Sequence, residues 1–284
     1  MKKQKNSSAW MALPLYIFTI VFVICPLLYV VALSFATPNR GYGVTWKFTL
    51  DNYKNILEPV YLNTFVESLK LALTSTAAIV LIGYPFGYFM AKLPERRKKK
   101  AHLLLTLPFW VNSLIRLYGW IIILQKKGLL NFVLMKLGLI KKPLAILYSY
   151  PAIVVGMIYV LLPFMIMSVY SSAEKLDWSY VEAARDLGAS RVQAFFTVTL
   201  KLTLPGLLSG VILTFVPSMG LFFIADILGG NKIVLVGSLI QDQMTRGSNW
   251  PFAAALAVVM MVLTTVMIMI YRKISNAREL EGIG

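Results

Sequence analysis

The sequence has little charge, one cysteine and one histidine, and these shortages exclude several classes of protein. Only 14% of its 284 residues are charged, whereas a soluble domain averages about 25%. Cys25 has no second cysteine for an internal disulfide. Around the single histidine, His102, no other His, Cys or carboxylate stands at metal-ligand spacing. A GxxxxGK[ST] phosphate loop is also missing, so we expect neither a resident metal nor ATP bound in that way.

Hydrophobic residues, in contrast, make up 58% of the chain. A hydrocarbon core about 30 Å thick requires roughly 20 apolar residues per spanning helix. Lipid offers no partners to unpaired backbone groups, so such runs should be helical. We predict an all-α polytopic membrane protein with a single domain over residues 1–284. Its six spans are expected near 10–36, 64–91, 102–124, 147–171, 202–225 and 251–271.

The distribution of lysine and arginine predicts the orientation of these spans. The net charge of +16 comes largely from short loops, which favours the positive-inside rule over nucleic-acid binding. With both termini in the cytosol, the cytosolic segments hold sixteen Lys and Arg residues and the external loops ten. The dense cluster KLPERRKKK between spans two and three supports this orientation, and it also suits anionic lipid headgroups. The first run follows MKKQK and is too long for a signal peptide, so we expect it to be retained.

Counting spans places the polar segment 172–201 in the cytosol. Ser172 is expected to cap a helix start, and Glu182–Ala184 are compatible with a second helix. Gly188 is expected to end that helix in a left-handed conformation. From spacing alone, an ordinary amphipathic loop on the bilayer surface explains the segment equally well.

A motif within this segment resembles the EAA loop of ABC importer permeases, whose pattern is EAAxxxG followed by nine residues and IxLP. The residues at the EAAxxxG positions are Glu182, Ala183, Ala184 and Gly188. The resemblance implies that a short helix over these residues and Asp186 couples the membrane domain to an ATPase.

The second half of the motif departs from the family pattern. Val198 stands where the family has Ile, Leu200 keeps the Leu, and Lys201 replaces the Pro. A Leu-Pro pair follows as Leu204 and Pro205. We therefore expect the helix break to lie one turn further along the chain.

The resemblance extends over roughly residues 50–255, where four stretches keep their order. They are LPFWVNSLIRLYGW, LLPFMIMSVYSSAEKLD, PSMGLFFIADILGG and NWPFAAA. These stretches resemble the spermidine/putrescine permease subunits of the PotB type. The resemblance implies a type I ABC importer permease fold with a coupling helix between spans four and five. It also implies ATP-driven polyamine uptake by alternating access, across the plasma (inner) membrane of a prokaryote.

The same resemblance implies a set of partners. They are a second, non-identical permease of the PotC type, an ATPase dimer of the PotA type that binds ATP and Mg, and an external polyamine-binding protein of the PotD type. Membrane lipids surround the chain, and no nucleic acid is expected. The chain itself is expected to be a permease without a cofactor of its own, not an enzyme.

Candidate residues of the substrate pathway or gate lie in spans three and five, those of span five near its external end. Phe222 and Asp226 are four residues apart and share a helix face, with Phe223 beside them. Aromatic rings next to a carboxylate suit a protonated amine. A solvated residue at a helix end is the alternative reading of the aspartate. From span three we add Trp110, Asn112 and Tyr118.

Other polar and small residues within the spans are expected to be structural. Arg116 is deep in span three and is expected to pair with Asp226 or with a partner subunit. Glu67 and Lys70 are expected to pair at i,i+3. Glycine and proline in span five, such as Gly206 and Gly210, mark either bends or close helix approach.

Three alternative functions remain open at this point. An ABC permease for another small solute, such as an inorganic anion or ferric ion, keeps the class and changes the cargo. A stand-alone ion-coupled secondary transporter would need no nucleotide-binding subunit. A membrane enzyme is the least expected, because no nucleophile-and-base pair or metal constellation lies within the spans.

Overall fold

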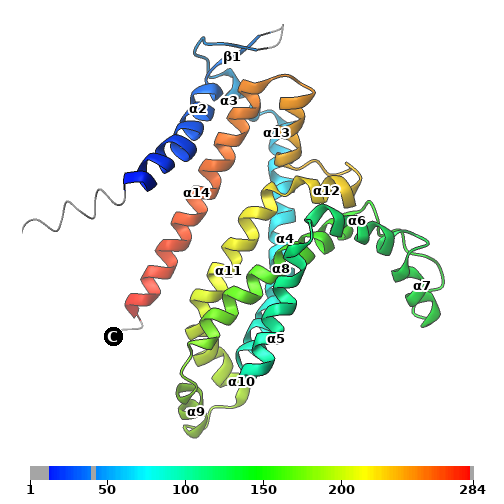
Figure 1. The fold of residues 1–284 in the computed structure, drawn as a ribbon, viewed down its shortest axis with the longest axis vertical. Coiled ribbons are helices and arrows are strands. Elements are labelled where there is room, and N and C mark those ends of the chain that lie inside the picture. Colours follow the sequence, from blue (N-terminus) through cyan, green and yellow to red (C-terminus); the bar gives the residue numbers. More distant parts are fainter. Residues whose placement is uncertain (1–12, 40–42, 282–284) are drawn as a thin grey trace, which may run out of the picture. The chain divides into compact units, whose positions relative to one another are not determined.

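The structure is a computed structural model that describes residues 13–39 and 43–281, with side chains as far as Lys273 (Figure 1). The chain divides into two compact units. One is formed by Met1–Asn63 and Leu239–Val266, and the other by Thr64–Ser238 and Met267–Gly284.

Six helices in the described part of the chain are long and apolar enough to cross a membrane, which confirms the predicted fold class. They contain between 22 and 33 residues each, and about 20 are sufficient. Their bounds are Leu13–Ser34, Pro59–Ala91, Ser113–Lys136, Tyr150–Glu174, Arg191–Gly220 and Trp250–Lys273.

The first unit begins with the helix Leu13–Ser34, of which Cys25–Ser34 is α2. A short antiparallel hairpin follows, with Thr37 (β1) paired to Thr45 (β2). The amide of Asn52 then donates hydrogen bonds of 2.9 Å to the carbonyls of Ser34 and Ala36, which ties the next helix to the end of α2. The elements of this loop are β1 (Thr37–Pro38), β2 (Val44–Thr45) and α3 (Asp51–Ile56).

The second unit contains most of the remaining helices. Those wholly inside it are α5 (Glu95–Thr106), α6 (Ser113–Leu124), α7 (Leu129–Lys136), α8 (Tyr150–Glu174), α9 (Ser179–Asp186), α10 (Arg191–Ala194), α11 (Leu200–Gly220) and α12 (Phe222–Gly229). Helices α4 (Pro59–Ala91), α13 (Val236–Thr245) and α14 (Trp250–Glu281) each contribute residues to both units.

Glycines on α11 bring it into close contact with α8. A Cβ atom on Gly206 would lie 2.4 Å from the Cβ of Ser172, and one on Gly210 would lie 2.5 Å from the sulfur of Met165. The Ser168 hydroxyl donates a 2.8 Å hydrogen bond to the Gly206 carbonyl. Small residues let two membrane helices approach closely, so these two glycines serve packing rather than bending.

Helix α12 is held on α8 in the same way. A Cβ on Gly156 would meet Leu228 at 2.5 Å and Ile224 at 2.7 Å. A Cβ on Gly229 would lie 2.6 Å from the Ile153 side chain. The apolar side of α12 is therefore fixed against α8, where Ile224 and Leu228 are fully buried.

The single span expected over 102–124 is wrong. Helix α5 ends at Thr106, a 3-10 turn covers Leu107–Trp110, and α6 begins at Ser113. Pro108 in the turn has no amide donor, and the Asn112 side chain accepts a 2.8 Å hydrogen bond from the Leu114 amide. Capping by Asn112 starts a new helix instead of continuing the old one.

The expected limits of span five, 202–225, are also wrong. The helix begins at Arg191, includes a π-helical turn over Phe195–Thr199 and ends at Gly220. Leu221, with φ −79° and ψ 56°, leaves the helical region and separates α12 from α11.

Two further expectations about the polar segment are corrected. Ser172 does not cap a helix start, because it lies inside the last turns of α8 and contacts α11. No helix break occurs at Leu204 and Pro205, because α11 continues through both residues. The irregular turn, Phe195–Thr199, lies before this pair and not after it.

Candidate functional site

Helix α9 is a short helix with a defined start and a defined end. At its start, the Asp177 carboxylate accepts a 3.0 Å hydrogen bond from the Ser179 amide, which lowers the pKa of Asp177. At its end, Gly188 has φ +92°, which confirms the expected left-handed conformation. The Gly188 amide donates to the Arg185 carbonyl at 3.0 Å and the Ala189 amide to the Ala184 carbonyl at 3.1 Å. These two bonds form a Schellman motif.

The surface of α9 is open around most of the helix. Glu182, Ala183, Arg185 and Asp186 are exposed, whereas Ala184 is half-buried. Leu187, directly after the helix, is 89% exposed. An adjacent cavity of about 460 Å³ is lined by six residues, which are Glu182, Arg185, Asp186, Ala189, Ser190 and Arg191. An exposed leucine beside acidic and basic side chains is typical of a surface that binds another protein.

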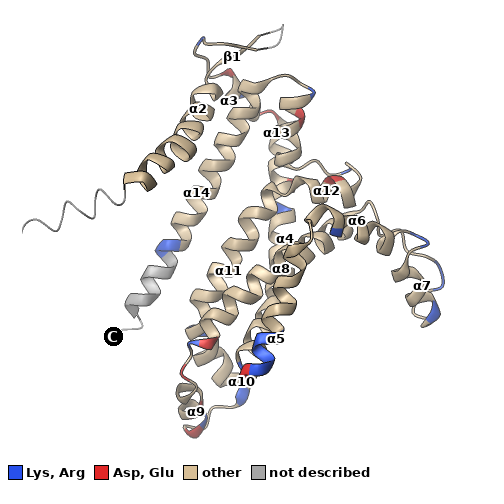
Figure 2. Ribbon diagram, in the orientation of Figure 1, with Lys and Arg blue, Asp and Glu red and all other residues tan. Residues whose placement is uncertain are grey.

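The basic cluster between α4 and α6 lies at the same end of the second unit as α9. Figure 2 shows the lysines and arginines gathered on the first turns of α5. Lys98 forms ion pairs with Glu95 at 3.0 Å and with Glu174 at 3.2 Å, and its side chain is 14% exposed. Because Glu174 is the last residue of α8, this lysine joins α5 to the helix that leads into α9.

Asp226 lies on α12 in a cavity that Tyr118 shares. This cavity of about 510 Å³ also includes Tyr148, Asn231 and Lys232. The Asp226 carboxylate accepts a 3.1 Å hydrogen bond from the Ser238 hydroxyl. The structure therefore brings together two of the residues predicted from different spans.

Asn112 and Phe223 line a second cavity of about 510 Å³, together with Arg116. The Arg116 guanidinium lies 5.3 Å from the centre of the Tyr159 ring and 5.9 Å from that of Phe109. The Nε atom of Arg116 is buried without a hydrogen-bond partner in the part of the chain that the structure describes. The expected pairing of Arg116 stays a prediction.

The remaining predicted pathway residues are placed differently. Trp110 is 79% exposed at the end of the 3-10 turn. Phe222 packs against Gly237, where a Cβ atom would lie 2.9 Å from its ring, and its ring lies edge-to-face on Phe223 at 6.4 Å. The two rings thus contact each other.

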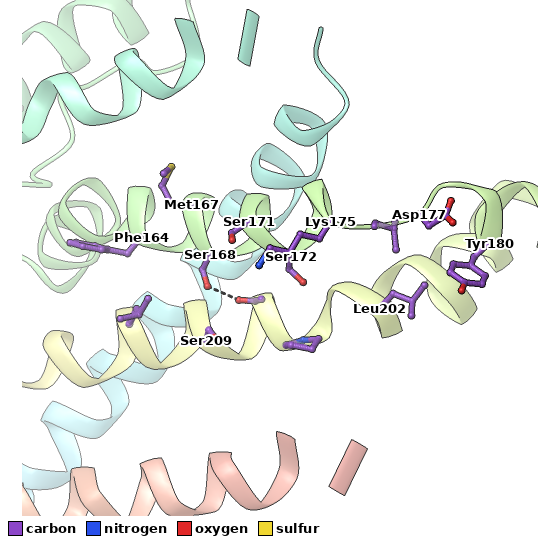
Figure 3. A pocket seen from close by; sticks show the side chains of 14 residues that line it. Phe164, Met167, Ser168, Ser171, Ser172, Lys175, Asp177, Tyr180, Leu202 and Ser209 are labelled. Carbon is purple, nitrogen blue, oxygen red and sulfur yellow. Dashed lines mark hydrogen bonds between the residues drawn. The ribbon is translucent and has the colours of Figure 1, made fainter. Parts of the chain in front are cut away.

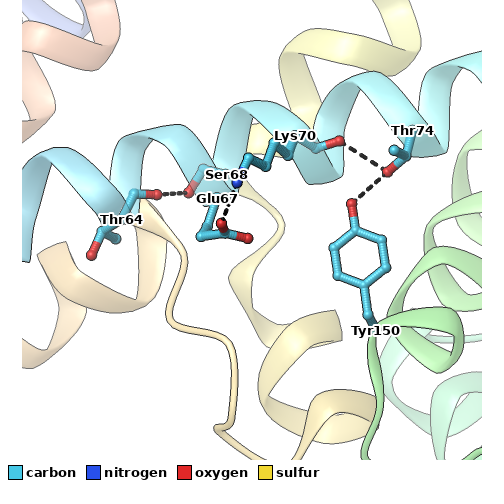
Figure 4. Close-up of polar contacts among 6 residues, drawn as sticks. All are labelled: Thr64, Glu67, Ser68, Lys70, Thr74 and Tyr150. Atoms are coloured by element: carbon cyan, nitrogen blue, oxygen red, sulfur yellow. Dashed lines mark hydrogen bonds and ion pairs between the residues drawn. The ribbon is translucent and has the colours of Figure 1, made fainter.

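Figure 4 shows polar contacts along α4, of which the one between Thr74 and Tyr150 reaches another helix. Lys70 and Glu67 form the expected ion pair at 2.7 Å. The hydroxyls of Thr74 and Tyr150 are 2.7 Å apart, which connects α4 to the start of α8. The Val236 amide donates a 2.9 Å hydrogen bond to the Ser68 hydroxyl.

A groove of about 750 Å³ between α8 and α11 was missed by the sequence analysis (Figure 3). Ser168, Ser171 and Ser172 on α8 line it, and Ser209 contributes from α11. Serines at i, i+3 and i+4 share one helix face, and this spacing was the signal that could have revealed it.

The chain belongs to a family of transporter membrane components. Residues 83–279, which include α9 and α12, match the family described as binding-protein-dependent transport system inner membrane component. It is therefore a membrane component of a transport system and not an enzyme. Membership in this family also disfavours a stand-alone secondary transporter.

Relatives within the family are similar along nearly the whole chain. The "Spermidine/putrescine transport system permease protein PotB" of Escherichia coli (strain K12) is 43% identical over 257 residues, covering 90% of this chain and 94% of the relative. The protein of the same name from Haemophilus influenzae is 42% identical over 266 residues, covering 92% and 93%.

Solved structures of ABC importers share the fold. A bacterial alginate ABC transporter, in complex with an alginate-bound periplasmic protein, has a chain that matches with a TM-score of 0.73 at 16% identity, covering 97% of this chain and 96% of that one. The MetNI methionine ABC transporter, in an inward-facing conformation, matches with a TM-score of 0.58 at 19% identity, covering 78% and 98%. These matches confirm the predicted type I importer permease fold.

Proposed function

We propose that this chain is the permease subunit of an ATP-driven importer that takes up the polyamines spermidine and putrescine. The observation that carries the proposal is the 43% identity to a spermidine/putrescine permease over 257 residues. A carboxylate in a cavity also suits a cationic cargo. Asp226 provides that carboxylate, and Tyr118 provides an aromatic wall.

Helix α9 is proposed to couple this permease to its ATPase. Glu182, Ala183 and Asp186 lie on its open surface, and Gly188 fixes where it ends. ATP and Mg bind to the partner ATPase dimer of the PotA type. Closure of that dimer displaces α9, and the permease pair then alternates between inward-open and outward-open states.

The remaining partners and the orientation are part of the same proposal. A second permease of the PotC type completes the membrane domain, and an external binding protein of the PotD type delivers the polyamine. Both termini, α9 and the basic turns of α5 face the cytosol. The joint position of α5 and α9 at one end of the unit, linked by Lys98 and Glu174, supports this orientation.

Labelling of introduced cysteines tests the orientation. Cys25 is the single native cysteine, so a Cys25→Ser background is free of native thiols. Lys99→Cys in this background should resist an impermeant maleimide in intact cells and react after permeabilisation. Efficient labelling of intact cells would invert the topology.

Uptake by the reconstituted complex tests the cargo. The whole transporter is placed in vesicles that contain ATP, and labelled spermidine, putrescine, molybdate and ferric ion are supplied with the binding protein outside. We expect ATP-dependent uptake of the two polyamines only. Transport of the anion or of ferric ion in their place would retain the class of protein and refute the polyamine assignment.

A further inference from the structure

A lysine held between aromatic rings connects the end of α4 to the start of α9. The Lys92 ammonium lies 4.3 Å from the centre of the Tyr88 ring and 4.6 Å from that of Trp178. The Tyr88 and Trp178 rings themselves meet edge-to-face at 5.8 Å. A cation within about 6 Å of a ring centre is attracted by the ring quadrupole. Lys92 therefore interacts favourably with both rings. We refer to Tyr84, Tyr88, Lys92, Trp178 and Phe195 as the Lys92 cluster.

Trp178 belongs to the first turn of α9 through its backbone. Its carbonyl accepts hydrogen bonds from the amides of Val181 at 3.0 Å and Glu182 at 3.1 Å. Its side chain points instead into the Lys92 cluster. A displacement of α9 therefore moves this indole against the lysine and the tyrosine.

On the other side, the Lys92 cluster reaches the membrane helices. Phe195 lies edge-to-face on Tyr88 at 5.8 Å and on Tyr84 at 5.9 Å. The Tyr84 hydroxyl, in the buried interior, is 2.8 Å from the hydroxyl of Thr203 on α11. Phe195 is also the first residue of the π-helical turn that precedes α11, and π-helical turns often occur at functional sites.

We propose that the Lys92 cluster transmits the movement of α9 to α4 and α11, with Lys92 and Trp178 as positioning residues for coupling. The inference rests on the proposed function of α9. Ring contacts and a cation–π contact suit this task because they are short-ranged and directional. Because the cluster bridges three helices, its loss should uncouple ATP hydrolysis from transport. The surface of α9 that contacts the ATPase would remain intact.

The stoichiometry of transport tests this proposal in the whole reconstituted transporter. Trp178→Ala and Lys92→Met are expected to assemble with the ATPase and to hydrolyse ATP at rates near those of the unchanged protein. Uptake per ATP hydrolysed should fall at least about fivefold, the lower end of usual coupling between two sites. Trp178→Phe and Lys92→Arg, which retain a ring and a charge, should restore most of this ratio.

Lys99→Met is the matched control, because Lys99 is an exposed lysine of the same basic segment and lies outside the cluster. It should leave the ratio unchanged. An unchanged ratio in both Trp178→Ala and Lys92→Met would overturn the proposal. Failure of both variants to assemble would also overturn it, because the cluster would then be needed for folding rather than for transmission.

A cargo-independent readout separates this proposal from the polyamine assignment. Ser171→Cys, in the Cys25→Ser background, places a thiol in the groove between α8 and α11. In a transporter without further substitutions, the labelling rate of this cysteine should change when the complex is trapped with ATP and vanadate. When Trp178→Ala is added, trapping should no longer change the labelling rate. A normal response in Trp178→Ala overturns the Lys92 cluster alone. No response in the otherwise unchanged transporter overturns the coupling role of α9 as well.

Discussion

Helices α11 and α9 lie on either side of a short connection, yet they are held in opposite ways. Helix α11 is packed on α8 through Gly206 and Gly210, with backbone atoms in near contact. Helix α9 has its charged residues in solvent, and the leucine after it is 89% exposed. The tightly packed helix α11 is suited to transmit a displacement through the membrane domain. The exposed helix α9 is suited to bind a partner protein that causes the displacement.

Filling the contact between α8 and α11 should have the largest effect. In Gly206→Ala the new methyl group would lie 2.4 Å from Ser172 Cβ and 2.7 Å from the Ser168 carbonyl oxygen. Overpacking of this kind typically costs about 1–3 kcal/mol, and contact with a backbone atom favours the upper end of that range. We expect a lower melting temperature and less assembled complex in size-exclusion chromatography.

The matched control is Gly119→Ala, because a Cβ at Gly119 on α6 meets nothing within 4 Å. It should be neutral or slightly stabilising, since alanine is the better helix former. Equal melting temperatures for the two variants would show that α8 and α11 are not tightly packed, and the contrast with α9 would be lost.

Changing the end of α9 should spare stability and impair coupling. Gly188→Pro cannot adopt φ +92°, so α9 would end differently. A distortion of about 2 kcal/mol at the docking surface corresponds to roughly a thirtyfold loss of ATP-driven uptake. Glu182→Lys, which reverses an exposed charge, should act in the same direction. ATP hydrolysis and uptake are measured together in vesicles.

Gly138→Pro is the control for backbone strain, because Gly138 has φ +70° and lies outside the α9 segment. It should retain coupling. If Gly188→Pro transports at the normal rate while bound to the ATPase, the α9 segment is only a surface loop.

Removing the charge of Asp226 should affect the cargo and leave the ATPase contact intact. Asp226→Asn keeps the shape of the side chain and is expected to reduce polyamine uptake about tenfold, equivalent to roughly 1.4 kcal/mol. Asp242→Asn serves as control, because Asp242 is on α13 and forms an exposed ion pair with Arg246 just after that helix. Wild-type uptake of both spermidine and putrescine by Asp226→Asn would remove Asp226 from the pathway.

The smallest expected effect concerns the start of α9. Hydrogen bonding to the Ser179 amide holds the pKa of Asp177 below its usual 3.8. A lowered pKa in the folded state stabilises the helix start above pH 3.8, and this contribution disappears as the pH falls through the pKa of the folded state. Amide exchange in α9, corrected for intrinsic rates, should therefore accelerate a few-fold below about pH 3.8. Asp177→Ala should show the faster exchange already at pH 7 and lose this pH dependence.

Much of the fold was predictable from runs of apolar residues, because a spanning helix depends mainly on length and hydropathy. The breaks within the runs were harder. Pro108 indicated the end of α5 and Asn112 the start of α6. The break was missed because the residues around them are apolar and read as one continuous span. Leu221 separates α12 from α11 directly after Gly220. The direction that α12 then takes depends on packing, because Ile224 and Leu228 lie against α8 at Gly156.

In the candidate site, too, local features were predictable from the sequence and contacts between helices were not. Gly188 was predicted correctly because a left-handed helix end is a local property of one residue. The shared cavity of Asp226 and Tyr118 joins two helices that are distant in sequence, and local patterns do not determine such contacts. The rings beside Arg116 belong to Phe109 in the 3-10 turn and Tyr159 on α8, so this contact also depends on packing between elements.

By itself, the sequence determined that this is a six-span helical membrane protein with a short helix, ended by Gly188, in a polar segment. Those properties follow from hydropathy and from single-residue backbone preferences, which act locally. Only the tertiary structure decided that Lys92 lies between Tyr88 and Trp178. Tyr88 and Trp178 are distant in sequence and meet because α4 packs closely on α8, for example at Gly87.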